Sequence, residues 1–170
     1  VAAPALAAEG FVDPLDGAAL ESALAVRGPL TAVTAAGRRL VAVGQRGHVL
    51  YSDDAGASWR QAAVPVSTDL TSVCFASPLR GWAAGHDGVV LATADGGRTW
   101  VKQLDGRRIG PLLAESYAGR AGADPPWLRE QLEVLAAQGV GHSLLDVWFE
   151  DERRGFAVGA FNLALRTEDG

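Results

Sequence analysis

The sequence predicts an all-β fold built from one repeated unit of short strands. Three observations support this prediction: a stretch of sequence recurs at a fixed interval, the apolar runs within each copy are short, and turn-forming residues separate these runs. Glycine contributes 21 of the 170 residues, which suits a fold with many tight turns. A hydrophobic content of 48% excludes a chain that is disordered throughout.

The repeat is clearest at glycines that follow apolar runs. Gly44 follows Leu-Val-Ala-Val and Gly85 follows Trp-Ala-Ala, and 41 positions separate the two glycines. A third copy has Gly159 at this place, 74 positions after Gly85, which is one period plus 33 additional residues. The copies also open alike, at Leu30, Leu70 and Leu145. We therefore treat the chain as a repeat protein.

Each copy has the pattern of four short strands. In the second copy the predicted strands are 70–75, 81–85, 89–93 and 99–102. Four strands in ~40–45 residues is the size of one β-propeller blade. We expect a first blade over 30–66, a second over 70–106 and an incomplete third over 144–170. Aromatic residues that share a repeat position, Trp82 with Phe156 and Trp59 with Trp100, are expected in the core between blades.

A shared turn pattern, Ser/Thr-x-Asp-x-Gly-x-Ser/Thr-Trp, lies between the third and fourth strands. The aspartate can accept N–H bonds within its own turn, glycine supplies a positive φ, and tryptophan packs between neighbouring elements. We expect these residues to be structural, and we call the two complete copies the aspartate turns. Their residues, with the start of a third copy, are Ser52, Asp54, Gly56, Ser58, Trp59; Thr93, Asp95, Gly97, Thr99, Trp100; Thr167 and Asp169.

The turn pattern resembles the Asp box, or BNR repeat, which recurs in bacterial sialidases and in many other β-propellers. The string from Arg80 to Trp100 resembles the photosystem II stability/assembly factor family, in its non-photosynthetic bacterial branch, and the resemblance covers roughly 30–170. It implies a seven-bladed propeller, of which this chain is an N-terminal fragment with two blades, most of a third and a helical insertion. It also implies a secreted, non-catalytic scaffold that assembles or stabilises a membrane complex, with RND-type exporters as candidate partners.

A sialidase-like or carbohydrate-binding propeller is the alternative. Sialidase chemistry needs an arginine cluster, a tyrosine nucleophile with a glutamate partner, and an acidic aspartate. The Phe/Tyr-Arg-Ile-Pro signature of that class is absent, and the only tyrosines are Tyr51, in a repeated strand position, and Tyr117. We therefore expect no enzymatic activity, no catalytic residue and no cofactor, while glycan binding stays open.

Other functional classes find little support in the composition. His48, His86 and His142 neither align between copies nor have the spacing of metal ligands, so no metal site is expected. The net charge of −5 leaves no basic footprint for nucleic acid. The sequence contains no apolar run of 18 residues, so no membrane-spanning helix is predicted. The single cysteine, Cys74, is expected to act as a small buried apolar residue.

The first residues predict the cellular location. Residues 1–8 resemble the end of a secretory signal peptide, because Ala5-Leu6-Ala7 is a small-x-small cleavage pattern and polarity begins at Glu9. Residues 9–29 then form a lead-in to the first blade. The protein is therefore expected in the periplasm or another extracytoplasmic compartment.

Blade topology predicts a face for binding a protein partner. In an up-and-down blade the turns between second and third strands lie opposite the aspartate turns. These turns vary in sequence while their flanking glycines repeat, which suggests a surface free to specialise. The candidate contacts in them are Gln45, Arg46, His86, Asp87, Phe161 and Asn162.

The insertion, 107–143, is expected to form two helices on that same face. Ile109, Leu112 and Leu113 before Tyr117 suggest a short first helix. The second would follow an N-cap at Asp124, with an apolar stripe of Leu128, Leu132 and Leu135. Trp127 is the candidate contact in this segment. A membrane complex or one of its subunits is the expected partner.

Overall fold

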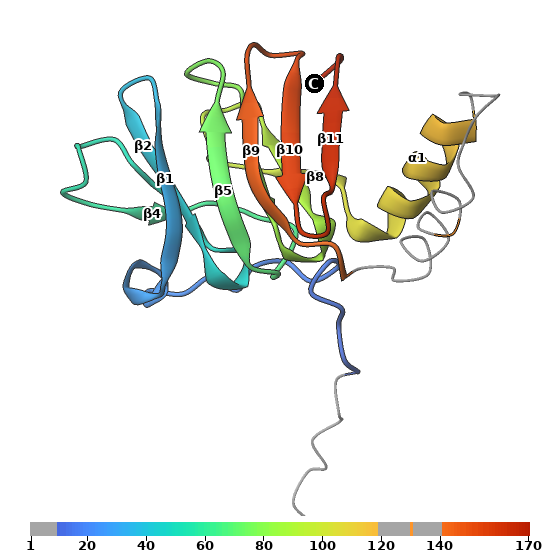
Figure 1. The fold of residues 1–170 in the computed structure, drawn as a ribbon. Coiled ribbons are helices and arrows are strands. Elements are labelled where there is room, and N and C mark those ends of the chain that lie inside the picture. The colour runs from blue at the N-terminus through green and yellow to red at the C-terminus, as the bar shows by residue number, and fades with distance from the viewer. Residues whose placement is uncertain (1–9, 119–129, 131–140) are drawn as a thin grey trace, which may run out of the picture.

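Three antiparallel sheets form the body of the protein (Figure 1). The computed structural model describes residues 10–118, 130 and 141–170. Each sheet is a meander in which strands adjacent in sequence are hydrogen-bonded neighbours. The strands are β1 (Leu30–Ala36), β2 (Arg39–Gly44), β3 (Val49–Ser52) and β4 (Arg60–Gln61); β5 (Leu70–Phe75), β6 (Gly81–Gly85), β7 (Val90–Thr93) and β8 (Val101–Leu104); β9 (Leu144–Phe149), β10 (Gly155–Gly159) and β11 (Ala164–Thr167). We number these sheets as blades one, two and three.

The blades stand side by side, with their first strands β1, β5 and β9 adjacent (Figure 1). The same hydrogen bond crosses both boundaries. Thr31 Oγ1 donates to the carbonyl of Leu70 at 2.6 Å, and Thr71 Oγ1 donates to the carbonyl of Leu144 at 2.8 Å. These threonines hold the first strand of one blade to the first strand of the next.

The third copy opens one residue earlier than the sequence comparison predicted. Leu144 pairs with Gly159 as Leu70 pairs with Gly85, so Leu144 and not Leu145 is the counterpart of Leu70. Two consecutive leucines fit the pattern equally well by residue type. Only the strand register distinguishes them.

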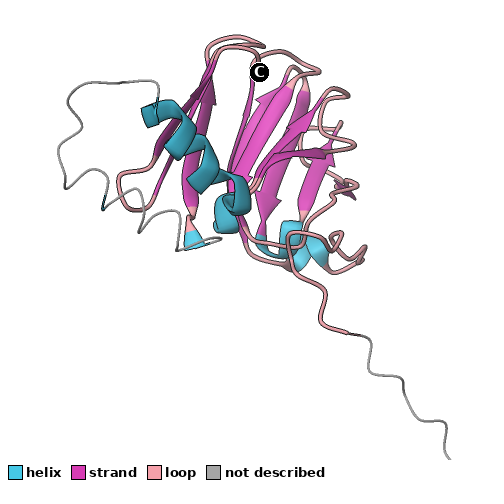
Figure 2. Cartoon of the chain, turned by 90° about the vertical axis from the view of Figure 1, so that its right-hand side faces the viewer, coloured by secondary structure: helices cyan, strands magenta, loops and turns pink. Residues whose placement is uncertain are grey.

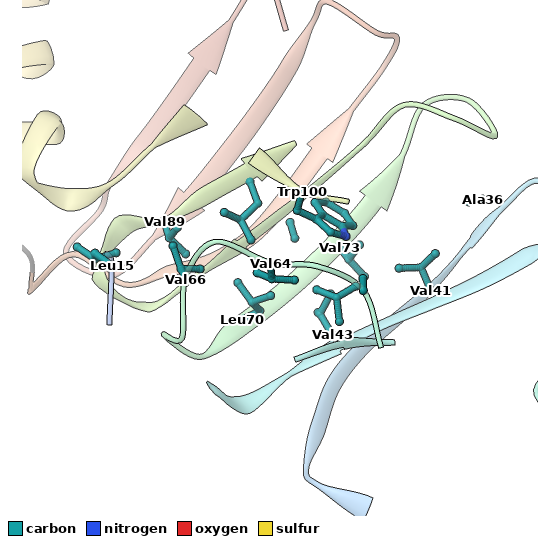
Figure 3. Close-up of a cluster of buried hydrophobic side chains, with 14 residues drawn as sticks. Leu15, Ala36, Val41, Val43, Val64, Val66, Leu70, Val73, Val89 and Trp100 are labelled. Carbon is teal, nitrogen blue, oxygen red and sulfur yellow. The ribbon is translucent and has the colours of Figure 1, made fainter. Parts of the chain in front are cut away.

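Two apolar clusters fill the two boundaries between blades. The first joins blades one and two and includes Val41, Val43, Val64, Leu70, Val73 and Trp100 (Figure 3). The second joins blades two and three, and its centre is the fully buried Trp82. The expectation for Trp82 and Trp100 is met, since their exposed fractions are 0% and 4%. Phe156 is 46% exposed on the side of the third sheet facing away from blade two, where no other described blade lies, so the expectation for it stays a prediction.

The aspartate turns are closed by the hydrogen bonds that the sequence predicts. Asp95 accepts backbone N–H bonds from Arg98 and Thr99 at 2.9 and 3.0 Å, and a bond from the Thr99 hydroxyl at 2.7 Å. The indole of Trp100 donates to the carbonyl of Gly97, which has a φ of +85°. Asp54 accepts the equivalent backbone and hydroxyl bonds from Ser58.

An arginine links the aspartate turns of blades one and two. The Arg39 guanidinium donates to both carboxylate oxygens of Asp53, at 2.7 and 2.9 Å, and to the carbonyl of Gly96 at 3.0 Å. Arg80 and Arg154 hold the same repeat position, directly before the second strand. Arg80 Nη2 lies 3.8 Å from the position that a Cβ on Gly170 would take. The arginine of blade two therefore lies close to the start of the aspartate turn of blade three, as Arg39 lies close to the turn of blade two.

The lead-in packs against blades one and two and meets the base of the insertion. Leu15 is 1% exposed in the first cluster (Figure 3), and its carbonyl accepts a bond from Lys102 at 2.6 Å. Arg107 forms ion pairs with Asp13 and Asp16, both at 2.8 Å.

The insertion begins as helix α1 (Gly106–Ala118). Asp105 accepts a bond from the backbone N–H of Arg107, and Ile109 is fully buried. The expected second helix and Trp127 lie outside the described residues, as does the expected signal-peptide remnant at 1–8. Within the described part of the chain, no helix has the length and apolar character needed to cross a membrane.

Candidate docking face

The turns between second and third strands share one geometry. His48, Val89 and Leu163 each donate a backbone N–H to the carbonyl three residues earlier, at 3.0–3.2 Å. Both central residues of each turn have positive φ, which defines the type I′ turn that two-residue hairpins favour. The central pairs are Arg46 (+57°) and Gly47 (+70°), Asp87 (+55°) and Gly88 (+67°), and Phe161 (+57°) and Asn162 (+59°).

The backbone of these turns is anchored to the blade. The residue after each repeated glycine donates its N–H to the carbonyl that precedes the first strand of the same blade. The three bonds are Gln45 to Pro29 at 3.2 Å, His86 to Asp69 at 2.8 Å and Ala160 to Ser143 at 2.9 Å. Side chains add two bonds, from the Arg46 N–H to Asp69 at 2.8 Å and from the Thr68 hydroxyl to Asp87 at 2.7 Å. Contacts placed on these turns are therefore held in position before any partner arrives.

The end of the blades that carries the three turns is called the turn face. It is the lower end in Figure 1, and the aspartate turns lie at the opposite end. Asp87 is half-buried, and the other predicted contacts that the structure describes are exposed. These exposed residues are Gln45, Arg46, His86, Phe161 and Asn162.

Phe161 is the unusual member of the turn face. Its side chain is 69% exposed, although its counterparts in the other turns are the polar Arg46 and Asp87. Its φ of +57° is in the left-handed region, which costs a residue with a Cβ about 1–2 kcal/mol. Neither burial nor backbone preference explains a phenylalanine here. A contact with a partner would.

The insertion leaves the blades at the turn face. A Cβ on Gly88 would come within 2.6 Å of Ile109 and 2.8 Å of Gly106, so the start of α1 lies directly against the turn of blade two. His86 Nδ1 lies 3.0 Å from the Ser143 hydroxyl, just before β9. Figure 2 shows α1 rising from this end along the side of the sheets. The described ends of the insertion therefore flank His86.

The structure also shows the surroundings of the tyrosine, histidine and cysteine side chains that the sequence analysis discussed. Tyr51 is half-buried with the Arg39 guanidinium 4.6 Å from its ring centre. His86 is exposed, while His142 is fully buried. Burial raises the pKa of the Cys74 thiol to about 11, which keeps it protonated at neutral pH. Over residues 10–118, 130 and 141–170, no group of three His, Cys, Asp or Glu side chains could hold a metal ion.

Comparison with known proteins supplies an independent result. No family model matches the chain. The chloroplastic photosystem II stability/assembly factor HCF136 of Cyanidioschyzon merolae is 43% identical over 47 residues, which are 26% of this chain and 11% of that factor. The chain is homologous to this assembly factor. The homologous stretch is short relative to the factor's length.

A solved structure confirms the fold. The chain matches YCF48 bound to D1 peptide with a TM-score of 0.54 and 17% identity, over 82% of this chain and 36% of that one. YCF48 from Cyanidioschyzon merolae also matches, with a TM-score of 0.49, 17% identity, and coverage of 82% and 37%. YCF48 is a β-propeller, so the sheets of this chain are propeller blades, as the repeat predicted. The chain spans about a third of the solved propeller.

The sequence patterns did not predict two features of the structure. The arginine at positions 39, 80 and 154 was readable from the repeat, but its contact with the next blade was not. The positive φ of Phe161 had no signal, because glycine marks the other two turns and the third has none.

Proposed function

We propose that this chain forms part of a non-catalytic β-propeller scaffold, an assembly or stability factor that docks on a membrane protein complex through its turn face. The observation that carries the proposal is the homology to HCF136. The turn face supports it with a rigid backbone and an exposed aromatic residue at Phe161. A preformed surface of this kind suits binding and needs no reactive group.

The partner is a polypeptide segment of a membrane protein. The solved YCF48 is described as bound to D1 peptide, and we carry only the class of ligand over to this chain. Its turn face offers the aromatic ring of Phe161 and donors from Arg46 and Asn162, which suits a peptide with apolar and carbonyl groups. An RND-type exporter is the candidate complex.

The location belongs to the proposal as well. The Ala5-Leu6-Ala7 pattern supports export through a signal peptide to the periplasm, where an envelope complex could be reached. We assign the aspartate turns to the Asp-box, or BNR, class on their residue pattern and hydrogen bonds. They support the blades and have no part in chemistry.

Gene deletion with complementation tests the proposal. Loss of the gene should lower the amount of one assembled membrane complex, measured by native electrophoresis and quantitative proteomics of membranes. The full-length protein with Arg46→Glu, His86→Glu and Phe161→Asp should be made at normal levels and fail to restore that complex. A matched control with Arg38→Glu and Arg153→Glu, both exposed and away from the turn face, should restore it. An unchanged membrane proteome in the deletion strain would refute the proposal.

The glycan-binding alternative is tested separately. The full-length protein should neither hydrolyse a chromogenic sialoside nor bind specifically to a glycan array. Hydrolysis at a rate that depends on protein concentration would replace the scaffold proposal with a glycosidase.

A further inference from the structure

The lead-in contains a tight turn over 13–17, which we call the lead-in turn. The backbone N–H groups of Asp16 and Gly17 donate to the carbonyl of Asp13 at 2.8 and 3.0 Å. The Asp13 carboxylate also accepts the N–H of Leu15 at 2.9 Å. These bonds close the turn from within, and they leave the side chains of Asp13 and Asp16 at its surface, 43% and 51% exposed.

The lead-in turn is fastened to the blades at the turn-face end. Leu15 is 1% exposed and packs beside Val89, directly after the turn of blade two (Figure 3). The N–H of Ser67, in the link between blades one and two, donates to the carbonyl of Pro14 at 2.8 Å. In Figure 1 the blue lead-in runs below the blades, at the end that carries the turn face. Its two carboxylates are therefore held in place before any other segment contacts them.

Arg107, in the first turn of α1, contacts both carboxylates. Its Nη1 and Nη2 donate to the two oxygens of Asp16 at 3.0 and 2.8 Å, and Nη2 lies 2.8 Å from Asp13 Oδ2. A second cation, Lys102, lies 3.4 Å from the Asp16 carboxylate and 3.0 Å from that of Asp105. A single exposed ion pair contributes little, but a bidentate arginine within a network of charges has a defined direction.

The first turn of α1 is held on two sides. Ile109 is fully buried against the turn of blade two, where a Cβ on Gly88 would come within 2.6 Å of it. Arg107 is two positions earlier, which places it about 200° from Ile109 around the helix axis. An apolar contact is not directional, so Ile109 alone would let the helix tilt. The bonds from Arg107 to the lead-in turn remove that freedom.

This anchoring matters because α1 is weak immediately afterwards. Gly110 and Pro111 follow Ile109 inside the helix. Proline has no N–H, so the carbonyl of Arg107 lacks its helical donor at position 111, and glycine adds backbone freedom. The direction of the rest of α1 therefore depends on how firmly its first turn is held.

We propose that the lead-in turn is a clamp for the insertion: Asp13 and Asp16 hold Arg107, and this contact sets the direction in which the insertion leaves the turn face. The described ends of the insertion flank His86, so its direction decides what stands beside the docking contacts. The step to docking rests on the function proposed above, in that the partner binds well only when the insertion is clamped. The three charged residues are therefore positioning residues, which act on the partner through the insertion.

Distances between two spin labels test the clamp on the 170-residue chain. The labels are attached through Glu115→Cys in α1 and Arg38→Cys in blade one, both at exposed positions, and Cys74→Ala removes the native thiol. The distance distribution should be narrow. Arg107→Asp or Asp16→Arg should broaden it about twofold, because each change places like charges where the ion pair was.

A charge swap and a neighbouring arginine are the controls for these variants. Arg107→Asp combined with Asp16→Arg restores opposite charges and should restore the narrow distribution. Arg108→Asp should leave the distribution unchanged, because the described bond of Arg108 goes to the carbonyl of Gln103 and not to the lead-in. Equal distributions in all four variants, or equal broadening by Arg107→Asp and Arg108→Asp, would overturn the clamp.

Complementation of the deletion strain with the full-length protein tests the step to docking. Arg107→Asp should lower the amount of the assembled complex about fivefold, the size of a modest coupling between two sites. The charge swap should restore the complex, and Arg108→Asp should leave it unchanged. If Arg107→Asp restores the complex while the triple variant of the turn face does not, the proposed function stands and the clamp has no part in docking. If both restore it, the proposed function fails, and the step to docking fails with it.

Discussion

The indole ring of Trp82 lies flat against the phenyl ring of Phe149, with centroids 3.5 Å apart and planes 4° from parallel. The contact crosses the boundary between blades two and three. A Cβ on Gly155 would come within 2.5 Å of the Phe149 ring, and a Cβ on Gly81 within 2.6 Å of Phe75. The glycine that opens the second strand therefore makes room for a phenylalanine in the same blade. That phenylalanine can then face the preceding blade.

Replacing Trp82 tests how far this contact joins the blades. Trp82→Ala should lower the free energy of unfolding by about 3–5 kcal/mol, because a fully buried ring is lost and a cavity remains. Trp148→Ala is the control, since Trp148 is 54% exposed on the far side of blade three, and it should change stability by less than about 1 kcal/mol. Chemical denaturation of the 170-residue chain measures both. Equal losses would mean that the two blades are not joined through Trp82.

Asp95→Ala should lower the free energy of unfolding by about 1–3 kcal/mol, because two backbone N–H groups and two hydroxyls lose their acceptor. Partner binding per folded molecule should be unchanged, since the aspartate turns lie opposite the turn face. Denaturation and a binding assay on the same preparation check both results. Normal stability with lost binding would make Asp95 a functional residue.

Acid should destabilise the aspartate turns over a defined range of pH. The hydroxyl and backbone N–H of Ser58, with the hydroxyl of Ser52, lower the pKa of Asp54 to about 2 from the usual 3.8. A carboxyl with a depressed pKa in the folded state stabilises fully above its unfolded pKa, and the contribution is lost as pH falls from about 4 to 2. Unfolding curves between pH 6 and 2 should show a smaller loss of stability for Asp54→Asn. An identical pH dependence in the variant would contradict this assignment.

Phe161 should separate stability from binding. Phe161→Gly relieves a positive φ and should raise the free energy of unfolding by about 1 kcal/mol, while partner binding weakens because the exposed ring is lost. Asn162→Gly is the control, because asparagine tolerates this conformation and the ring of Phe161 stays in place. Thermal unfolding and complementation of the deletion strain measure the two effects. A stabilised Phe161→Gly protein that still restores the complex would exclude Phe161 from binding.

Much of the fold could be predicted because the repeat fixes strand order. The predicted second blade differs from β5–β8 only at strand ends, since glycine and aspartate mark each turn. Register was harder, because Leu144 and Leu145 fit the pattern equally. Phe156 shares a repeat position with Trp82, but only Trp82 has a described neighbouring blade to cover it.

The candidate site could be predicted in position but not in detail. Because strand direction alternates, Arg46, Asp87 and Phe161 lie at the same end of the blades. Gly47 and Gly88 predict tight turns there, and both have a positive φ. The hydrogen bond between His86 and Ser143 joins residues 57 positions apart, across the insertion. Such a contact depends on how blades stack, which no local pattern encodes. The same holds for the bonds from Arg39 to the next aspartate turn.

Site-specific photocrosslinking in cells tests docking through the turn face most directly. A photoreactive amino acid is placed in the full-length protein at Arg46, His86 or Phe161, and at Arg38 or Arg153 as controls away from that face. The turn-face positions should crosslink to one shared membrane protein, and the control positions should not. Crosslinks to that protein from the control positions alone would contradict it.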